Sequence, residues 1–440
     1  MPPRWLKFLP PTLQRQLASP MAQKLVGNTG WLFADKLLKA VGELTVGIWL
    51  ARYLGPDQFG TLSFAIAFVA LFTPFYTLGL DKIVVRDIVQ HPEQARETLG
   101  SALGLRLAAG VVIAAGVTGL AVVLRPSEPL LQGLIGLMAF GMVFQASDVV
   151  TFWFQSQIQA RRDVVARSSA YGLTTLARIG CIIARAPLSV IGLTYVFEPM
   201  ARAFGLTVIY WKVEGFKQKW NFKVKQALKL LKQSWPLIFS SIAIMVYMRI
   251  DQVMLGQIAT NESVGIYSAA VKISEGWYFI PVTIASSIFP AIVQLKGVDE
   301  TSYHKQLKNL LKLIVAISYS IILVLVLFSR PIIVTLFGID YLESSTVLMI
   351  HAWAGVFASL GTVRGLWMIT ENHLNLTLAF TFFGALLNIV LNYLLIPDFL
   401  AIGASIATLI SYFFASYAFG FFVPSTQKIT FDMTKAIFMR

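Results

Sequence analysis

The chain has 440 residues, of which 56% are hydrophobic and only 13% are charged. A soluble domain carries about 25% charged residues, so this composition excludes an ordinary water-soluble protein and favours a membrane protein. The net charge of +14 would at first fit a nucleic-acid-binding protein, so the positions of the charged residues along the chain decide its meaning. Of the Lys and Arg residues outside the membrane, 24 fall in segments expected on one side and four on the other. This is the positive-inside pattern, so no nucleic-acid partner is expected.

Twelve apolar segments follow one another along the chain. About 20 apolar residues in a helix cross the hydrocarbon layer, and a helix satisfies its own backbone hydrogen bonds in lipid. We therefore expect an all-α integral membrane protein with twelve transmembrane helices. The expected spans are 28–52, 59–80, 97–124, 130–156, 164–186, 188–212, 234–257, 263–294, 309–336, 345–369, 374–396 and 401–424.

The second six spans resemble the first six. The segment 59–65 returns as 264–270, and Arg125-Pro126 returns as Arg330-Pro331, both at a spacing of 205 residues. Because six is an even number, both copies start on the same side of the bilayer, and a pseudo-two-fold axis along the membrane normal should relate them. Parallel repeats of this kind are typical of transporters whose substrate path lies between two lobes.

The spacing of the spans also predicts the domain organisation. Both termini are expected in the cytoplasm, and the loops are too short to hold a soluble catalytic domain, so we expect no enzyme. No metal-ligand cluster, phosphate loop or Rossmann fingerprint occurs, so no cofactor or bound metal is expected. The expected parts are a cytoplasmic or interfacial segment 1–26, an N-lobe 27–213, a basic amphipathic linker 214–233 on the anionic leaflet, a C-lobe 234–424 and a cytoplasmic tail 425–440.

Ionisable residues inside the spans are the candidate site. Each costs about 2.5–3.5 kcal/mol to insert and usually faces a wet cavity or a partner. Asp35, Lys39 and Glu43 follow an i, i+4, i+8 spacing and share one face of the first span. Cations suit a phosphate or diphosphate headgroup, and carboxylates can bind sodium or protons as coupling ions or hold the cations in place. The candidate headgroup contacts are Lys39, Arg106, Lys272, Arg364 and Arg249, and the candidate carboxylates are Asp35, Glu43, Asp148, Asp251 and Glu275.

Structural roles compete with these functional ones. Glu198 and Arg202 have the spacing of a closed i, i+4 pair. Arg178 and Arg364 lie toward the ends of their spans, where long side chains can extend to the interface. At the repeat spacing of 205 residues, Pro74 corresponds to residue 279, which is only two residues from Pro281. The two prolines therefore predict matching kinks in the two repeats.

Three segments carry a family resemblance: LGPDQFGTLS at 54–63, DQVMLG at 251–256 and VGIYSAAVKI at 264–273. In these motifs and in its layout the chain resembles the polysaccharide (O-antigen, Wzx-type) flippases of the multidrug, oligosaccharidyl-lipid and polysaccharide exporter superfamily. The resemblance implies a monomer of 6+6 helices in the cytoplasmic membrane that flips a polyprenyl-diphosphate-linked oligosaccharide by alternating access. It also implies membrane lipids and polysaccharide polymerase or assembly proteins as partners. Lys272 lies inside the matched motif.

Two other functions stay open. A cation-coupled multidrug antiporter of the same superfamily would need an acidic or apolar cavity, which the excess of cations within the spans disfavours. A membrane glycosyltransferase or polymerase would need a larger outer loop than any that the expected spans leave.

Overall fold

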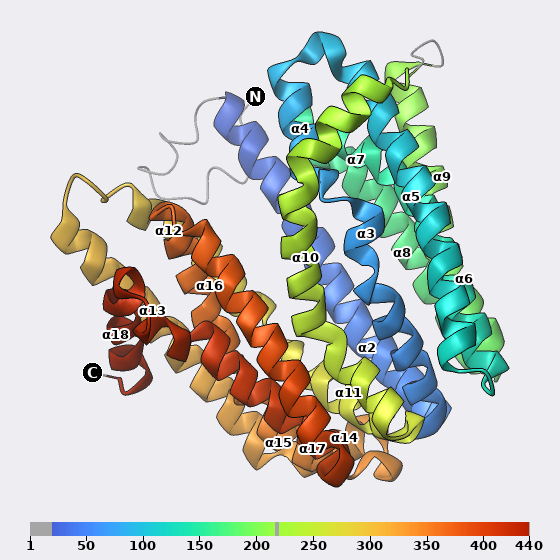
Figure 1. Cartoon of the computed structure of the whole chain (residues 1–440), viewed down its shortest axis with the longest axis vertical. Coiled ribbons are helices and arrows are strands. Elements are labelled where there is room, and N and C mark those ends of the chain that lie inside the picture. The colour runs from blue at the N-terminus through green and yellow to red at the C-terminus, as the bar shows by residue number, and fades with distance from the viewer. Residues whose placement is uncertain (1–19, 216–219, 440) are drawn as a thin grey trace. The chain divides into compact units, whose positions relative to one another are not determined.

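The computed structural model describes residues 20–215 and 220–439, and within these ranges the chain is helical and has no strand (Figure 1). The expectation of an all-α protein is confirmed. Short 3-10 turns at 92–94, 145–148, 339–341 and 418–421 join some of the helices. The α-helices are α2 (Pro20–Leu71), α3 (Thr73–Thr77), α4 (Leu80–Gln90), α5 (Ala95–Leu124), α6 (Pro129–Phe144), α7 (Val149–Ser156), α8 (Ala160–Ile183), α9 (Leu188–Glu214), α10 (Val224–Ile258), α11 (Asn261–Glu275), α12 (Phe279–Val293), α13 (Glu300–Leu327), α14 (Ser329–Phe337), α15 (Ser344–His351), α16 (Ala354–Thr370), α17 (Leu374–Ser416) and α18 (Pro424–Ile437).

Eight helical stretches in the described part of the chain are long and apolar enough to cross a membrane. Two of them contain a residue with a positive φ, Gly55 (φ 72°) in α2 and Leu400 (φ 48°) in α17. Glycine tolerates this left-handed conformation, and Pro56 directly follows it, so the first long helix divides there into two. Charged residues interrupt α8 and α9, which coincide with the expected fifth and sixth spans but are not among the eight. The number twelve stays a prediction.

Helix interruptions occur at equivalent places in the two repeats. In the first repeat, α2 ends at Leu71, and Leu78 and Gly79 adopt left-handed conformations between α3 and α4. In the second, α11 ends at Glu275 and α12 begins at Phe279. Residue 72 maps to residue 277 at the repeat spacing of 205, which falls inside the second gap. The prolines at 74 and 281 lie at the starts of the helices that follow, as their restricted φ favours.

Two equivalent glycines of the repeats contact each other. A Cβ added to Gly60 would lie 1.7 Å from the carbonyl oxygen of Asn261 and 2.8 Å from the backbone nitrogen of Gly265. A Cβ on Gly265 would lie 2.0 Å from the carbonyl oxygen of Pro56. Residues 60 and 265 are 205 apart, so corresponding backbone segments of the two repeats pack directly together. Contact between equivalent residues is the arrangement that a pseudo-two-fold axis produces.

Replacing Gly60 by Ala should destabilise the protein by about 1–3 kcal/mol, because the added methyl group meets backbone atoms that cannot rotate away. Thermal unfolding of the purified protein in detergent would measure the change. Gly116→Ala in α5 is the matched control, since nothing lies within 4 Å of its Cβ position. Equal melting temperatures for the two variants would contradict the packing described above.

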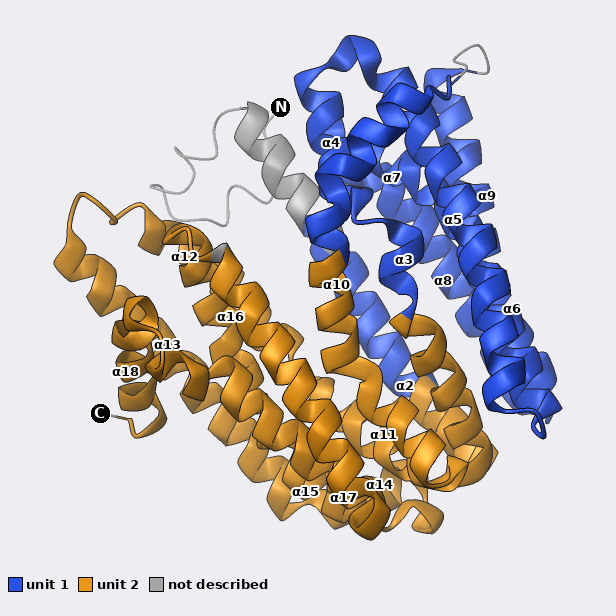
Figure 2. Cartoon of the chain, in the orientation of Figure 1, with its two compact units in different colours: residues 1–46, 72–238 blue, residues 47–71, 239–440 orange. Residues whose placement is uncertain are grey.

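The chain divides into two compact units (Figure 2). Unit 1 comprises residues 1–46 and 72–238, and unit 2 comprises residues 47–71 and 239–440. The expected lobes, 27–213 and 234–424, differ from this division because the second half of α2 groups with unit 2. Besides the glycine contact, the Tyr341 hydroxyl donates to the carbonyl oxygen of Ala51 at 2.7 Å, and Phe64 lies against Gly256. These contacts hold the segment 47–71 within unit 2.

The expected tail folds as a helix, whereas most of the expected N-terminal segment is not described by the structure. Most of the segment 1–26 lies outside the described residues. Of the expected tail 425–440, most forms helix α18, whose residues Ile429, Met433 and Ala436 are buried in the core of unit 2. The core that they join also contains residues of α13, so this helix is part of the folded unit.

The linker docks on unit 1. Its second half is the start of α10, where Leu230 is fully buried in the core that surrounds Leu80 and Leu99. The backbone N–H of Lys223 donates to Ser101 Oγ at 3.1 Å, and a Cβ at Gly100 would lie 2.5 Å from the carbonyl oxygen of Asn221. The expectation that the apolar residues of the linker lie on the anionic leaflet is therefore corrected for Leu230 and its buried neighbour at 227. Protein packing competes with the membrane for the same apolar face.

A buried carboxylate fastens this linker. Asp87 accepts hydrogen bonds from Thr98 Oγ1 at 2.8 Å, Gln226 Nε2 at 2.8 Å and Lys229 Nζ at 3.0 Å. Burial raises the pKa of Asp87, but the hydrogen bonds from Lys229 and Thr98 outweigh burial and leave this pKa below its ordinary value. A lowered pKa in the folded state stabilises the fold above the pKa of the unfolded chain, and this stabilisation is lost as the pH falls through the folded pKa.

Asp87→Asn should therefore lower the melting temperature at neutral pH and flatten its fall below about pH 4, where the wild-type carboxylate becomes protonated. Melting temperatures measured from pH 3 to pH 7 would show this. The exposed Asp340, changed to Asn, serves as the control. Identical pH profiles for wild type and Asp87→Asn would show that the linker is held in some other way.

Candidate functional site

The charged stripe of α2 is paired within unit 1. Asp35 is 4% exposed, and its Oδ2 lies 3.4 Å from Lys39 Nζ and 3.4 Å from Arg167 Nη2 of α8. Ser168 Oγ donates to the other oxygen, Oδ1, at 2.7 Å. Lys39 keeps 24% of its side chain exposed, and Glu43, one turn further along, is also exposed. The expected i, i+4 pair between Asp35 and Lys39 is thus present, and α8 completes it.

A second cluster joins α5, α9 and the turn after α6. Arg106 is 2% exposed and lies 3.3 Å from Asp81 Oδ1 and 4.0 Å from Asp148 Oδ2. Arg202 of α9 approaches Asp148 Oδ1 at 2.7 Å, and the Arg106 guanidinium stacks over Phe152 at 5.1 Å. The structure therefore brings Arg106 and Asp148, a candidate headgroup contact and a candidate carboxylate, into one cluster. A headgroup could reach Arg106 only if these contacts opened.

The expected i, i+4 pair of Glu198 and Arg202 does not form. Glu198 instead lies 3.4 Å from Arg178 Nη2 of α8, while Arg202 binds Asp148. Arg178 also donates from Nε to Thr194 Oγ1 at 3.1 Å and stacks over a tyrosine ring at 4.2 Å. Neighbouring helices supply closer partners than the residue one turn away, so Arg178 is held inside unit 1.

The other three candidate headgroup contacts, Lys272, Arg249 and Arg364, lie in unit 2. Lys272 in α11 lies against the backbone of α2, since a Cβ on Gly47 would be only 2.3 Å from its Nζ. Arg249 in α10 is partly exposed and interacts electrostatically with the Glu275 carboxylate. Arg364 in α16 is more enclosed. It is 6% exposed, and its Nη2 donates to a backbone carbonyl oxygen of α17 at 2.6 Å.

The burial of Arg364 bears on both roles considered for it, contact with the headgroup and extension to the membrane interface. Its guanidinium stacks over Phe380 at 4.9 Å, and its Nε and Nη1 have no hydrogen-bond partner among the described residues. The side chain therefore does not extend to the interface as the structural alternative expected. Like Arg106, it would need a rearrangement before a headgroup could contact it.

Asp251 is surrounded by neutral polar groups. Its carboxylate, 4% exposed, accepts hydrogen bonds from Tyr267 Oη at 3.0 Å, Thr408 Oγ1 at 2.8 Å and Asn392 Nδ2 at 2.5 Å. Asn392 Nδ2 also donates to Asn388 Oδ1 at 3.0 Å. No lysine or arginine of the described ranges forms an ion pair with Asp251. A buried carboxylate beside several oxygen atoms is suited to a hard cation or to a proton.

The neighbours of Asp251 were not predicted. Asn388 and Asn392 are fully buried and lie one turn apart on α17, so a pair of amides at i, i+4 spacing within an apolar span was the available signal. Tyr267 lies in the motif 264–273, but nothing in that motif pointed to Asp251, and Thr408 gave no signal. The break of α17 at Leu400 lies between the two amides and Thr408. Interrupted membrane helices commonly line ion sites, because their free backbone groups and polar side chains converge there.

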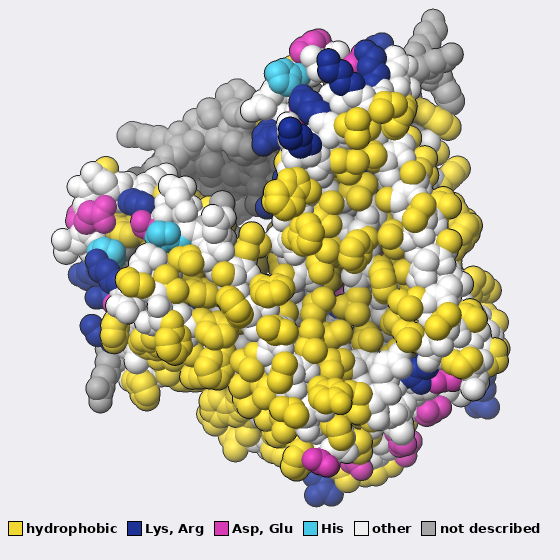
Figure 3. Space-filling view, viewed as in Figure 1, with side chains coloured by type: hydrophobic (Ala, Val, Ile, Leu, Met, Phe, Trp, Pro, Cys, Tyr) yellow, Lys and Arg dark blue, Asp and Glu magenta, His cyan; other side chains and the backbone are white. Residues whose placement is uncertain are grey.

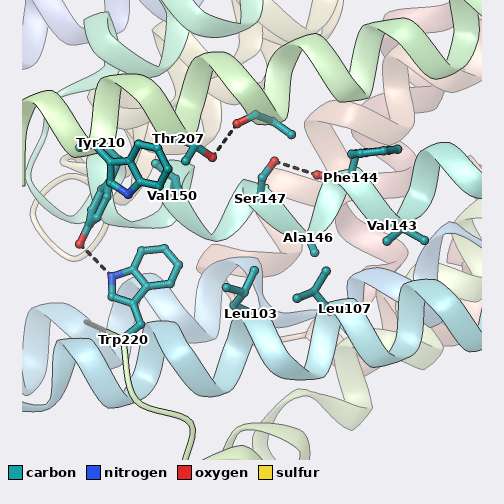
Figure 4. A pocket seen from close by; sticks show the side chains of 12 residues that line it. Leu103, Leu107, Val143, Phe144, Ala146, Ser147, Val150, Thr207, Tyr210 and Trp220 are labelled. Carbon is teal, nitrogen blue, oxygen red and sulfur yellow. Dashed lines mark hydrogen bonds between the residues drawn. The ribbon is translucent and has the colours of Figure 1, made fainter. Parts of the chain in front are cut away.

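Unit 1 also contains an apolar pocket of about 510 Å³ (Figure 4). At one end the Trp220 indole N–H donates to the Tyr210 hydroxyl at 2.8 Å. Its lining is suited to hydrocarbon and not to a sugar, and none of the predicted site residues lines it. The lining residues are Leu103, Leu107, Val143, Phe144, Ala146, Ser147, Val150, Ala203, Thr207, Tyr210, Trp211 and Trp220.

Sequence comparison decides the family. A sequence model of the polysaccharide biosynthesis protein family matches residues 25–296, which include the buried charges from Asp35 to Glu275. The chain belongs to this family. A model of the MatE family also matches residues 236–394 of this polysaccharide biosynthesis protein.

Two relatives have names that describe transport. A probable low-salt glycan biosynthesis flippase of Haloferax volcanii is 26% identical over 239 residues, which cover 53% of this polysaccharide biosynthesis protein and 48% of the relative. A putative O-antigen transporter of Shigella dysenteriae is 27% identical over 153 residues, 34% of this chain and 37% of the relative. The matches thus span about half or less of each relative.

Solved structures establish the fold. An inward-facing multidrug resistance MATE family transporter aligns with a TM-score of 0.69 at 15% identity and covers 90% of this polysaccharide biosynthesis protein and 96% of that transporter. The lipid II flippase MurJ in an inward closed conformation aligns with a TM-score of 0.68 at 14% identity, covering 94% and 90% of the two chains. The chain is therefore a multi-pass membrane protein with the fold that these two solved structures share.

Proposed function

We propose that this polysaccharide biosynthesis protein is a flippase that moves a polyprenyl-diphosphate-linked oligosaccharide, an O-antigen or exopolysaccharide repeat unit, from the inner to the outer leaflet by alternating access. The observation that carries the proposal is the family match over residues 25–296. The name of the Haloferax volcanii relative, a probable glycan biosynthesis flippase, supports it. The activity is transport and not catalysis.

The cations of the spans receive the anionic headgroup. Lys39, Lys272 and Arg249 are partly exposed, so they make the first contacts with the diphosphate. Arg106 and Arg364 are almost completely buried and join only when their present contacts open. Lysine provides a mobile point charge and arginine a bidentate donor, so the two types suit the arrival and the fixing of a diphosphate.

Asp251 couples transport to an ion gradient of sodium or protons. Its polar neighbours, its burial and the absence of an ion pair among the described residues support this role. Asp35 and Asp148 are held by cations and so keep Lys39, Arg106 and Arg202 in place. Among the predicted carboxylates, Asp251 is therefore the one best suited to release and rebind an ion.

The finer architecture follows from the same proposal. We infer twelve spans in two six-helix lobes related by a pseudo-two-fold axis, in a monomer of the cytoplasmic membrane with both termini inside. The matched helix breaks near residues 72 and 277 and the contact between Gly60 and Gly265 support the symmetry. Polymerase or assembly proteins that consume the flipped glycan would be partners on the outer side.

A cation-coupled multidrug antiporter is the second candidate, because a MATE family transporter shares the fold. Such a protein would bind cationic drugs, and the arginines and lysines within the spans repel them. We therefore favour the flippase.

Deleting the gene in its host distinguishes the two functions. Loss of the flippase should make the lipid-linked glycan accumulate in the inner leaflet, where an external glycan-oxidising enzyme cannot reach it, and a plasmid copy should restore access. Normal surface glycan combined with increased drug sensitivity would support the antiporter instead.

A further inference from the structure

A strongly basic pocket lies in unit 2, apart from the proposed transport residues. It has a volume of about 610 Å³ and lies between the first turns of α13 and helix α18. Figure 3 shows Lys and His side chains gathered over these two helices, neither of which contains an arginine. One carboxylate, Asp432, is among the lining residues. The lysines of the pocket are Lys305, Lys308, Lys312, Lys428 and Lys435.

Most of this charge is not compensated. Asp432 is buried and lies 3.3 Å from Lys308 Nζ, so one lysine is paired. Lys428 Nζ lies 2.7 Å from Nε2 of His304, which also lines the pocket. Lys305, Lys312 and Lys435 form no ion pair with any residue of the described ranges. Three like charges that converge on one pocket repel each other, and an anion in the pocket would remove that repulsion.

The exposed faces of α18 indicate where this anion is located. Lys428 and Lys435 are seven residues apart and line the pocket. Phe431 and Phe438 are also seven residues apart and are 55% and 68% exposed. Helices with lysines beside exposed aromatic side chains lie in the membrane interface, with the aromatic rings at the boundary of the acyl chains.

The position of α13 agrees with an interfacial site. This helix is among those apolar enough to span a membrane, and its lysines lie only in its first four turns, before the uncharged stretch from residue 313. Lys312 therefore lies where the span enters the hydrocarbon. The charge distribution of the sequence assigns this end of the helix to the cytoplasmic side.

We propose that this pocket binds the phosphate headgroup of an anionic phospholipid, with the acyl chains against the exposed Phe431 of α18 and Phe438, which directly follows this helix. Basic pockets beside membrane helices on the cytoplasmic side bind such headgroups, and each lysine near the surface contributes to the attraction. A soluble phosphate would use the lysines but not Phe431 and Phe438. The bound lipid fastens α18 to α13 and to the leaflet, whatever the transported substrate is.

Native mass spectrometry of the full-length protein tests the site. The protein in detergent is titrated with phosphatidylglycerol or with phosphatidylcholine of the same acyl chains. The wild type should retain phosphatidylglycerol in preference. The triple variant Lys305→Gln, Lys312→Gln, Lys435→Gln should bind phosphatidylglycerol about 100-fold more weakly. Its binding of phosphatidylcholine should not change.

The matched control is Lys82→Gln, Lys212→Gln, Lys225→Gln, which removes the same charge from exposed positions of unit 1 and should keep the preference. If the first triple variant fails to fold, the single change Lys435→Gln should weaken binding about fivefold. Equal losses in both triple variants would overturn the proposal. So would displacement of phosphatidylglycerol by millimolar inorganic diphosphate, or stronger retention of a polyprenyl diphosphate through the same lysines.

Discussion

Replacing Lys272 by Ala is expected to lower the rate of glycan-lipid translocation by on the order of 100-fold, because a charge partner of the diphosphate is removed from within the spans. Lys272 lies in the motif that resembles the flippase family, and its ammonium group rests against Gly47 of α2. The rate would be measured with purified protein in liposomes. Membrane abundance and melting temperature should stay close to those of the wild type.

Two further variants make this prediction specific. Lys272→Arg keeps the charge and should retain part of the activity. Gly47→Ala adds a methyl group at 2.3 Å from the Lys272 Nζ position, so the flexible ammonium must move and the rate should fall without any change of charge. Normal translocation by Lys272→Ala would remove this lysine from the site.

Replacing Asp251 by Asn should abolish the response of transport to an ion gradient and lower the driven rate at least about tenfold. The charge that binds a sodium ion or a proton is then absent, while the shape of the side chain is retained. Transport into liposomes would be compared with a sodium gradient, with a proton gradient and with neither. The exposed Asp340→Asn is the matched control.

A second variant separates coupling from folding. The amide of Asp251→Asn faces the donors Asn392 and Tyr267 and could disturb the packing. Thr408→Ala keeps the carboxylate and removes one oxygen, so it should raise the ion concentration needed for half-maximal transport. Unchanged gradient dependence in both variants would show that Asp251 is structural.

Much of the fold could be predicted from the sequence, because apolar length and helix breakers act locally. The helices, the interruption near Pro74 and the equivalent one near Pro281 follow from these properties. The assignment of the segment 47–71 to unit 2 could not be predicted. Hydropathy predicts only that a segment enters the membrane. The unit with which the segment 47–71 packs depends on the close backbone contact of Gly60 and Gly265.

The charged residues show the same limit. The pair of Asp35 and Lys39 was predictable, since both lie on one helix face. The partners of Arg202 and Asp251 come from other helices, and no local spacing specifies them. Asp148 lies 54 residues before its partner Arg202 in the chain. Thr408 lies more than 150 residues after its partner Asp251. Long-range packing therefore determines which buried charges are neutralised and which stay available.

Reconstitution tests the central claim most directly. Liposomes containing the purified protein and a fluorescent polyprenyl-diphosphate oligosaccharide would be exposed to a quencher that cannot cross the membrane. A flippase makes the label in the inner leaflet accessible, and the account predicts quenching of both leaflets only when the protein is present. A protected inner-leaflet label, together with gradient-driven movement of a cationic dye by the same protein, would contradict it.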